Sequence, residues 1–117
     1  MTMHEYSLVS ALLEKATAEA RARNARAIAR MEVRIGEQAG VEIDLFKKAY
    51  EMFREPTLAR NAELAITSVP AHWGCPSCQR VVEPGAILRC PVCGAPAQLF
   101  EGDEIVLDRL ELEVDDV

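Results

Sequence analysis

In the first part of the chain the spacing of the apolar residues changes once, and this change separates a predicted helix from a predicted strand. Residues 5–27 have the spacing of a helix, and one face carries Val9, Leu12, Leu13, Ala16 and Ala20. Asn24 is a candidate end for this helix. In residues 29–35 apolar and charged residues alternate, which predicts a half-buried strand.

A second helix and a second strand follow the loop of residues 36–40. The helix is expected to begin with Asp44 as its N-cap and to end before Pro56. One face carries Leu45, Phe46, Ala49, Tyr50 and Phe53. Residues 62–67 alternate again and predict a strand. A last strand is expected near residues 105–114, where the apolar phase changes at Asp108 as in a bulge.

Residues 70–100 interrupt this pattern. They hold all 4 cysteines and have almost no periodic apolar residues, so burial alone cannot order them. The fold predicted is therefore α+β: two helices packed on a small three-stranded sheet, with an inserted domain. The domain boundaries expected are residues 1–69 with 101–117, and residues 70–100 for the insert.

The cysteines form two Cys-x-x-Cys pairs, Cys75 with Cys78 and Cys90 with Cys93. Two such pairs supply four thiolates for a tetrahedral Zn²⁺ site, and because protein fills every position the zinc would be structural. The insert is therefore expected to resemble a zinc ribbon. Two disulfides, a thioredoxin-like redox pair and a rubredoxin-like iron site are the alternatives.

Composition limits the function. The chain has 117 residues and a net charge of −6, which disfavours nucleic acid as a partner. No apolar run reaches the roughly 18–20 residues of a membrane span, and the first ten residues do not look like a secretory signal. We expect a cytoplasmic protein that uses no membrane. No constellation of catalytic residues is apparent, so we do not expect an enzyme.

The two histidines have different surroundings. His72 lies three residues before Cys75 and is interpreted as a surface or packed residue. His4 lies in Met3-His4-Glu5, where two interpretations compete. Thr2 and Glu5 have the spacing of a helix capping box, whereas an amine, backbone amides and an imidazole make a nitrogen site that suits Ni²⁺ or Cu²⁺.

The chain resembles the HypA/HybF family of nickel metallochaperones that serve [NiFe]-hydrogenase maturation. The resemblance spans Met3 to about Val114. It rests on Met3-His4-Glu5-Tyr6-Ser7-Leu8, Ile35-Gly36-Glu37, Leu45-Phe46 with Ala49-Tyr50-Glu51, the two cysteine pairs, and Leu110-Glu111-Leu112-Glu113-Val114.

The resemblance implies two metal sites. Ni(II), the cargo, would be held by the His4 imidazole and by backbone groups of Met3 and Glu5, with Glu42 as an additional acidic neighbour. Structural Zn(II) would be held by Cys75, Cys78, Cys90 and Cys93. The implied partners are a GTPase of the same maturation pathway and the hydrogenase large subunit. It stays open whether the protein also serves urease maturation factors, and whether it is a monomer or a homodimer.

Two departures from the family pattern matter. Met1-Thr2 precede the motif that should begin the chain, and we expect the physiological start to be Met3. Gln79 and Gly94 stand where some members have a histidine after each cysteine pair, so histidine exchange at the zinc is not expected. The alternative functions are a zinc-ribbon module that binds protein or nucleic acid, and an iron-sulfur-type electron carrier.

Overall fold

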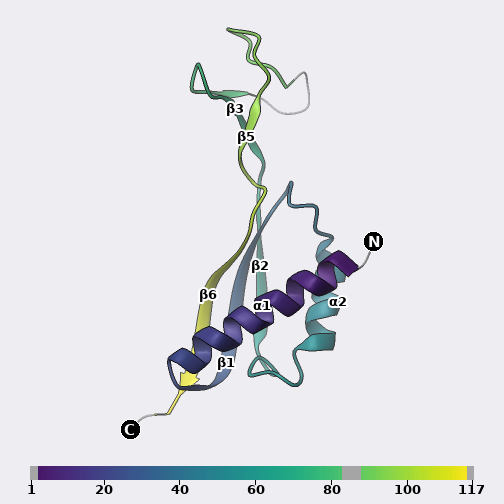
Figure 1. The fold of residues 1–117 in the computed structure, drawn as a ribbon, viewed down its shortest axis with the longest axis vertical. Helices are drawn as coiled ribbons and strands as arrows, with labels where there is room; N and C mark the ends of the chain where they lie inside the picture. The colour runs from purple at the N-terminus through teal and green to yellow at the C-terminus, as the bar shows by residue number, and fades with distance from the viewer. Residues whose placement is uncertain (1–2, 83–87, 116–117) are drawn as a thin grey trace. The chain divides into compact units, whose positions relative to one another are not determined.

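The computed structural model describes residues 3–82 and 88–115, and the chain divides into two compact units. Unit 1 comprises Met1–Arg34, Val41–Thr67 and Val106–Val117, and unit 2 comprises Ile35–Gly40 and Ser68–Ile105. The predicted α+β class is confirmed, with two helices, a three-stranded sheet and an inserted cysteine-rich segment (Figure 1). The boundaries expected at residues 69 and 101 stay a prediction.

Helix α1 of unit 1, Met3–Ala22, buries the face that the sequence predicts, with Val9, Leu13, Ala16 and Ala20. It ends earlier than the expected residue 27. The amide of Asn24 donates to the carbonyl of Arg21 at 3.0 Å, and Asn24 has φ 57°, a left-handed conformation typical of the residue after a helix. Residues 25–27 belong to the next strand instead.

The sheet of unit 1 has the order β2-β1-β6. Its strands are β1 (Ala25–Gly36), β2 (Glu63–Val69) and β6 (Ile105–Val114). In β1 the buried phase is Met31, Val33 and Ile35, as predicted. In β6 the less exposed residues are Ile105, Leu107, Leu110 and Leu112, so the phase changes near Asp108 as expected.

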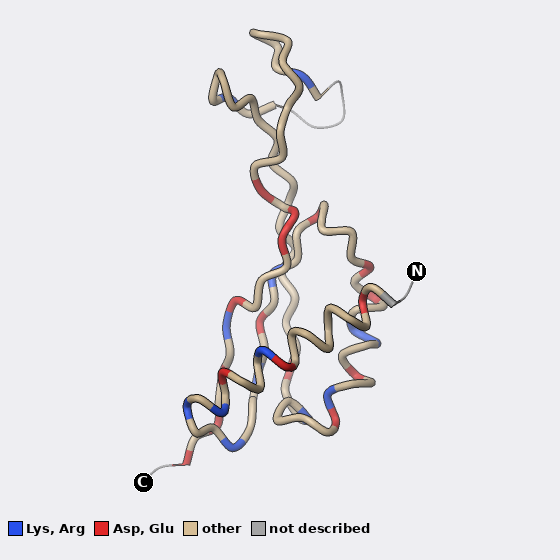
Figure 2. Tube along the Cα trace, viewed as in Figure 1, with Lys and Arg blue, Asp and Glu red and all other residues tan. Residues whose placement is uncertain are grey.

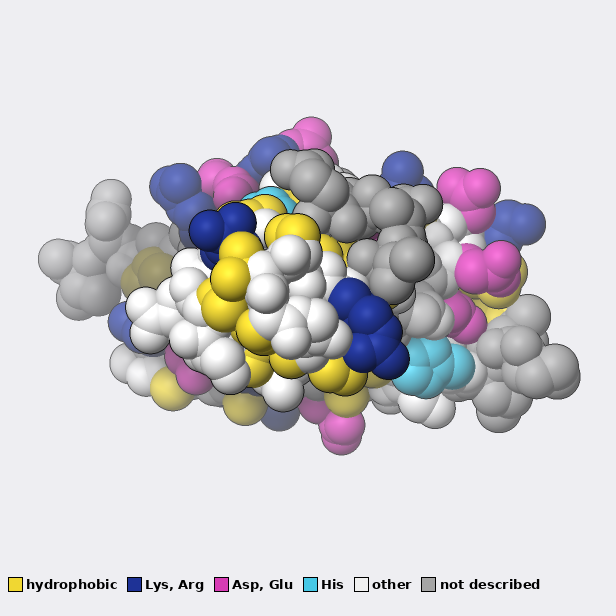
Figure 3. Space-filling model, turned by 90° about the horizontal axis from the view of Figure 1, so that it is seen from above, with side chains coloured by type: hydrophobic (Ala, Val, Ile, Leu, Met, Phe, Trp, Pro, Cys, Tyr) yellow, Lys and Arg dark blue, Asp and Glu magenta, His cyan; other side chains and the backbone are white. Residues whose placement is uncertain are grey.

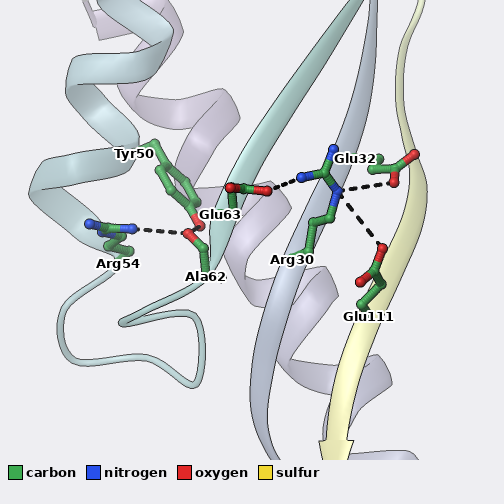
Figure 4. Close-up of polar contacts among 7 residues, drawn as sticks. All are labelled: Arg30, Glu32, Tyr50, Arg54, Ala62, Glu63 and Glu111. Carbon is green, nitrogen blue, oxygen red and sulfur yellow. Dashed lines mark hydrogen bonds and ion pairs between the residues drawn. The ribbon is translucent and has the colours of Figure 1, made fainter.

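The face of this sheet opposite the helices is charged. Arg30 of β1 lies between three carboxylates (Figure 4). It pairs with Glu32 at 3.2 Å, with Glu111 of β6 at 3.8 Å, and with Glu63 of β2. Ion pairs across strands favour one register at a solvated sheet face.

Helix α2 of unit 1, Ile43–Phe53, packs against α1 and buries Phe46, Ala49 and Tyr50. One prediction about it is wrong. Its N-cap is Glu42 rather than Asp44, which lies in the first turn. Phe53, on the predicted apolar face, is 37% exposed, and its ring makes a T-shaped contact with Tyr6 of α1.

Unit 2 contains a second sheet of order β4-β3-β5. Strands β3 (His72–Cys75), β4 (Arg80–Val82) and β5 (Gln98–Glu101) are short and antiparallel. Gly74 permits the ring of Phe100 to lie against β3, since a Cβ there would stand 2.2 Å from that ring. Val81 and Val92 are exposed apolar residues of this unit. Figure 3 shows hydrophobic side chains, in yellow, at its surface.

Two chain segments of unit 2 meet where the sheet of β3–β5 ends. The amide of Gly36 donates to the carbonyl of Glu104, and that of Gln38 to Gly102, at 2.8 and 2.7 Å. A Cβ on Gly36 would stand 2.1 Å from the carbonyl oxygen of Gly102, so only glycine permits this approach.

In the described residues, no helix is long and apolar enough to cross a membrane.

Candidate metal centres

The four cysteines meet in unit 2, although 11 residues separate the two pairs in the sequence. Their sulfur atoms all lie within 4.8 Å of one another, and the sulfurs of Cys75 and Cys93 are 3.6 Å apart. Four thiolates at the usual Zn–S distance of about 2.3 Å place their sulfurs about 3.8 Å apart. The cluster therefore fits a tetrahedral ion of zinc's size.

Each cysteine pair lies on a tight turn. The first turn joins β3 to β4, where the amide of Gln79 donates to the carbonyl of Cys75 at 2.8 Å. In the second turn the amide of Gly94 donates to the carbonyl of Cys90 at 2.9 Å. Both donor residues have positive φ, 55° for Gln79 and 74° for Gly94. The two turns therefore have the same construction.

Backbone amides also point at the sulfurs. The amide of Cys78 donates to Cys75 Sγ and that of Val92 to Cys90 Sγ, each at 3.4 Å. Amides of Cys93 and Val92 lower the pKa of Cys90 to about 6, whereas hydrogen bonding to Cys93 and Cys90 raises the pKa of Cys78 to about 12. Donors of this kind stabilise thiolate, the form that binds a metal.

The predicted nickel residues lie in unit 1. Met3, His4 and Glu5 form the first turn of α1, and the His4 side chain is exposed. Met1 and Thr2 lie outside the described residues, and with them the Thr2 half of the predicted capping box. Among the described residues, only the four cysteines gather three or more metal-binding side chains within reach of one ion.

The structure brings Glu42 next to this first turn. The backbone amide of Glu42 donates to Glu5 Oε2 at 3.1 Å, and this hydrogen bond lowers the pKa of Glu5. The Glu5 side chain is 3% exposed. Sequence reasoning gave the Glu5 carboxylate only a local role, in the capping box with Thr2. It missed the contact with Glu42, because nothing local indicates a contact across 37 positions.

The His72 side chain contacts Glu101 of β5. Its Nδ1 is 3.1 Å from Glu101 Oε2 across the β3–β5 pair, and the side chain is largely exposed. The interpretation of His72 as a surface residue therefore agrees with its position.

The model of the family "Hydrogenase/urease nickel incorporation, metallochaperone, hypA" matches residues 3–112. Hydrogenase maturation factor HypA of Wolinella succinogenes is 38% identical over 117 residues, which cover 97% of this chain and 98% of that protein. The Shewanella oneidensis factor is 37% identical over 114 residues, covering 95% and 96%.

Two solved structures are also similar. The solution structure of the nickel metallochaperone HypA from Helicobacter pylori matches with a TM-score of 0.73 and 32% identity, covering 95% of this chain and 98% of that one. A second solution structure of a HypA protein matches with a TM-score of 0.78 and 32% identity, covering 97% and 98%.

Proposed function

The chain belongs to the HypA family of nickel metallochaperones for hydrogenase maturation, and from this premise we propose that it carries Ni(II) at its N-terminal segment. The ligands would be the His4 imidazole with the amine and backbone amides of Met3 and Glu5. Glu42 would act as a secondary acidic neighbour. Nitrogen-rich sites of this kind suit Ni²⁺.

The observation that carries this proposal is the position of Glu42. Its backbone amide bonds to the side chain of Glu5, so the residue that carries the candidate carboxylate is held at the first turn of α1 although the two are far apart in sequence. His4 is exposed on that turn. A site at an exposed helix start can take up a cation and release it to a partner.

The test is nickel titration of His4→Ala, with His72→Ala as the matched control. The chain has 2 histidines, and both are exposed, so the control removes the same group from the other unit. We expect His4→Ala to abolish specific nickel binding and His72→Ala to retain it. Equal nickel affinity in wild type and His4→Ala would contradict the assignment of the nickel site to His4.

The two chain starts should be compared in the same titration. A protein that begins at Met3 has its amine directly before His4, which allows the family's site. A protein that begins at Met1 and retains that residue has one amide too many for a compact square plane. We expect different nickel spectra from the two proteins.

We further propose that the four cysteines hold structural Zn(II). The support is the fit of the sulfur cluster to a tetrahedral ion and the amides aimed at the thiolates. All four positions are protein atoms, so such a zinc would have no open position for a substrate.

The proposed partners are a GTPase of the same pathway and the hydrogenase large subunit, in the cytoplasm. Nucleic acid is not among them. Residues 73–82 and 88–100, as the structure describes them, carry Arg80 and Arg89 and no carboxylate (Figure 2). A zinc tetrathiolate carries two negative charges, which would offset the two arginines and leave little attraction for phosphate.

A further inference from the structure

The N-termini of both helices in unit 1 share one carboxylate. Glu5 lies in the first turn of α1, and Glu42 is the N-cap of α2. The side chain of Glu42 makes no capping hydrogen bond of its own. Instead its backbone amide is satisfied by Glu5 Oε2 at 3.1 Å. Glu5 thus supplies from α1 an acceptor that α2 lacks locally.

Glu5 is buried more completely than a capping role requires. It is the buried charged side chain of the described residues, at 3% exposure. Its second oxygen, Oε1, is buried and has no hydrogen-bond partner among those residues. Burial of an unsatisfied acceptor opposes folding, whereas the hydrogen bond from the Glu42 amide favours the charged carboxylate. The capping contact therefore explains Oε2 but does not explain the buried Oε1.

The groups on either side of the contact belong to the proposed nickel site. His4 precedes Glu5 in the first turn of α1, and the Glu42 carboxylate extends from the residue whose amide is held. The Glu5–Glu42 hydrogen bond therefore fixes the backbone of one candidate nickel residue against the turn that carries the others.

We infer that the Glu5 carboxylate is a positioning residue for the nickel site and not a nickel ligand. Oε2 holds the start of α2, and with it Glu42, against the start of α1. The Glu5 charge is carried by a carboxylate whose Oε1 has no hydrogen-bond partner among the described residues, and this favours a divalent cation bound alongside. This inference rests on the proposed nickel site and assigns a second role to a residue proposed there only for its backbone.

Two variants separate the roles. Glu5→Gln retains an oxygen that can accept from the Glu42 amide but loses the charge. Glu5→Ala loses both. Glu14→Ala is the matched control, because Glu14 is an exposed glutamate on the same helix.

The first measurement uses metal-free protein and hydrogen exchange of the Glu42 amide by NMR. We expect exchange at Glu42 to accelerate about tenfold or more in Glu5→Ala, as loss of a charge-assisted hydrogen bond predicts. Glu5→Gln should change it much less, and Glu14→Ala should not change it. Unchanged exchange in Glu5→Ala would overturn the inference whatever happens with nickel.

The second measurement is the nickel absorption spectrum and affinity. We expect Glu5→Gln to keep the wild-type spectrum with affinity weakened several-fold, and Glu5→Ala to alter the spectrum as well. If Glu5→Gln and Glu5→Ala alter the spectrum alike, the carboxylate is a nickel ligand. If neither variant alters the spectrum or the affinity, the carboxylate has no role at the nickel site. Either result overturns the inference. A wild type that binds nickel no better than His4→Ala rejects the proposed function, and Glu42 exchange still reports on the contact.

Discussion

Gln79 and Gly94 occupy the same place in the two cysteine turns, directly after the second cysteine. Both have the left-handed backbone, with φ of 55° and 74°, and both donate their amide to the carbonyl of the first cysteine. The sequence indicates the conformation at Gly94, because glycine is the usual residue there. It does not indicate it at Gln79, because glutamine carries no such signal.

Gln79 and Gly94 allow a prediction at the scale of single residues. Gln79→Gly should stabilise unit 2 by about 0.5–1 kcal/mol, because it relieves a left-handed residue with a Cβ. Gly94→Ala should destabilise it by about 1 kcal/mol, and the cost should come from the backbone alone since a Cβ there meets no atom within 4 Å.

The measurement is denaturant unfolding of the metal-loaded protein, followed by fluorescence of Trp73 in β3, the single tryptophan of the chain. Equal midpoints for wild type and Gln79→Gly, or stabilisation by Gly94→Ala, would contradict this account of the turns.

At the scale of elements, one carbonyl joins the end of α2 to the start of β2. The carbonyl of Ala62 accepts from the Tyr50 hydroxyl at 2.8 Å and from Arg54 Nη1 at 2.9 Å (Figure 4). Arg54 also lies 5.3 Å from the centre of the Tyr50 ring. Burial raises the pKa of Tyr50, so the neutral hydroxyl is the form that the folded state favours.

We expect Tyr50→Phe to lower the free energy of unfolding by only about 1 kcal/mol, because Arg54 still satisfies the Ala62 carbonyl. The wild type should lose stability as pH rises above about 10, the ordinary pKa of tyrosine, because only the unfolded chain then ionises Tyr50 readily. The measurement is urea unfolding by circular dichroism at pH 8 and pH 10.5. An equal loss of stability at high pH in Tyr50→Phe would rule out Tyr50 as its source.

The elements show how far the sequence reaches. Apolar spacing predicted both helices, the buried phase of β1 and the phase change in β6, because each depends on neighbours a few positions away. It misplaced the end of α1, since residues 25–27 form helices well but are held in β1 by pairing. It misplaced the start of α2, because the acceptor for Glu42 comes from Glu5.

For the candidate sites too, the contacts that the sequence predicts are those between residues close together along the chain. The cysteine cluster follows from spacing that is local within each pair. The neighbourhood of Glu42 was available only through the family resemblance, and the contact of the Glu5 carboxylate with Glu42 was not predicted. Contacts between residues distant in sequence depend on how α1 and α2 pack, and spacing along the chain does not encode that.

At the scale of the whole molecule, the buried apolar side chains are distributed very unequally. Of those found in the described residues, twelve lie in unit 1, and those in residues 68–105 are Cys75, Val82 and Cys90. The strands of that segment have three or four residues each. Such a segment has too little buried area to fold on apolar contacts alone, and two of its three buried residues are proposed metal ligands.

Removal of the metal should therefore unfold one unit and leave the other. Structural zinc contributes about 10–16 kcal/mol to small zinc-binding units, far more than the few buried residues here can supply. After treatment with a strong chelator, or in Cys90→Ala, we expect amides of β3, β4 and β5 to lose protection in hydrogen exchange. Amides of α1 and β1 should keep it, because the core of unit 1 contains no cysteine. Ser77→Ala, an exposed change between two ligands, is the control and should match wild type. Protected strands in the metal-free protein, or collapse of both units together, would mean that something other than the cysteine cluster orders residues 70–100.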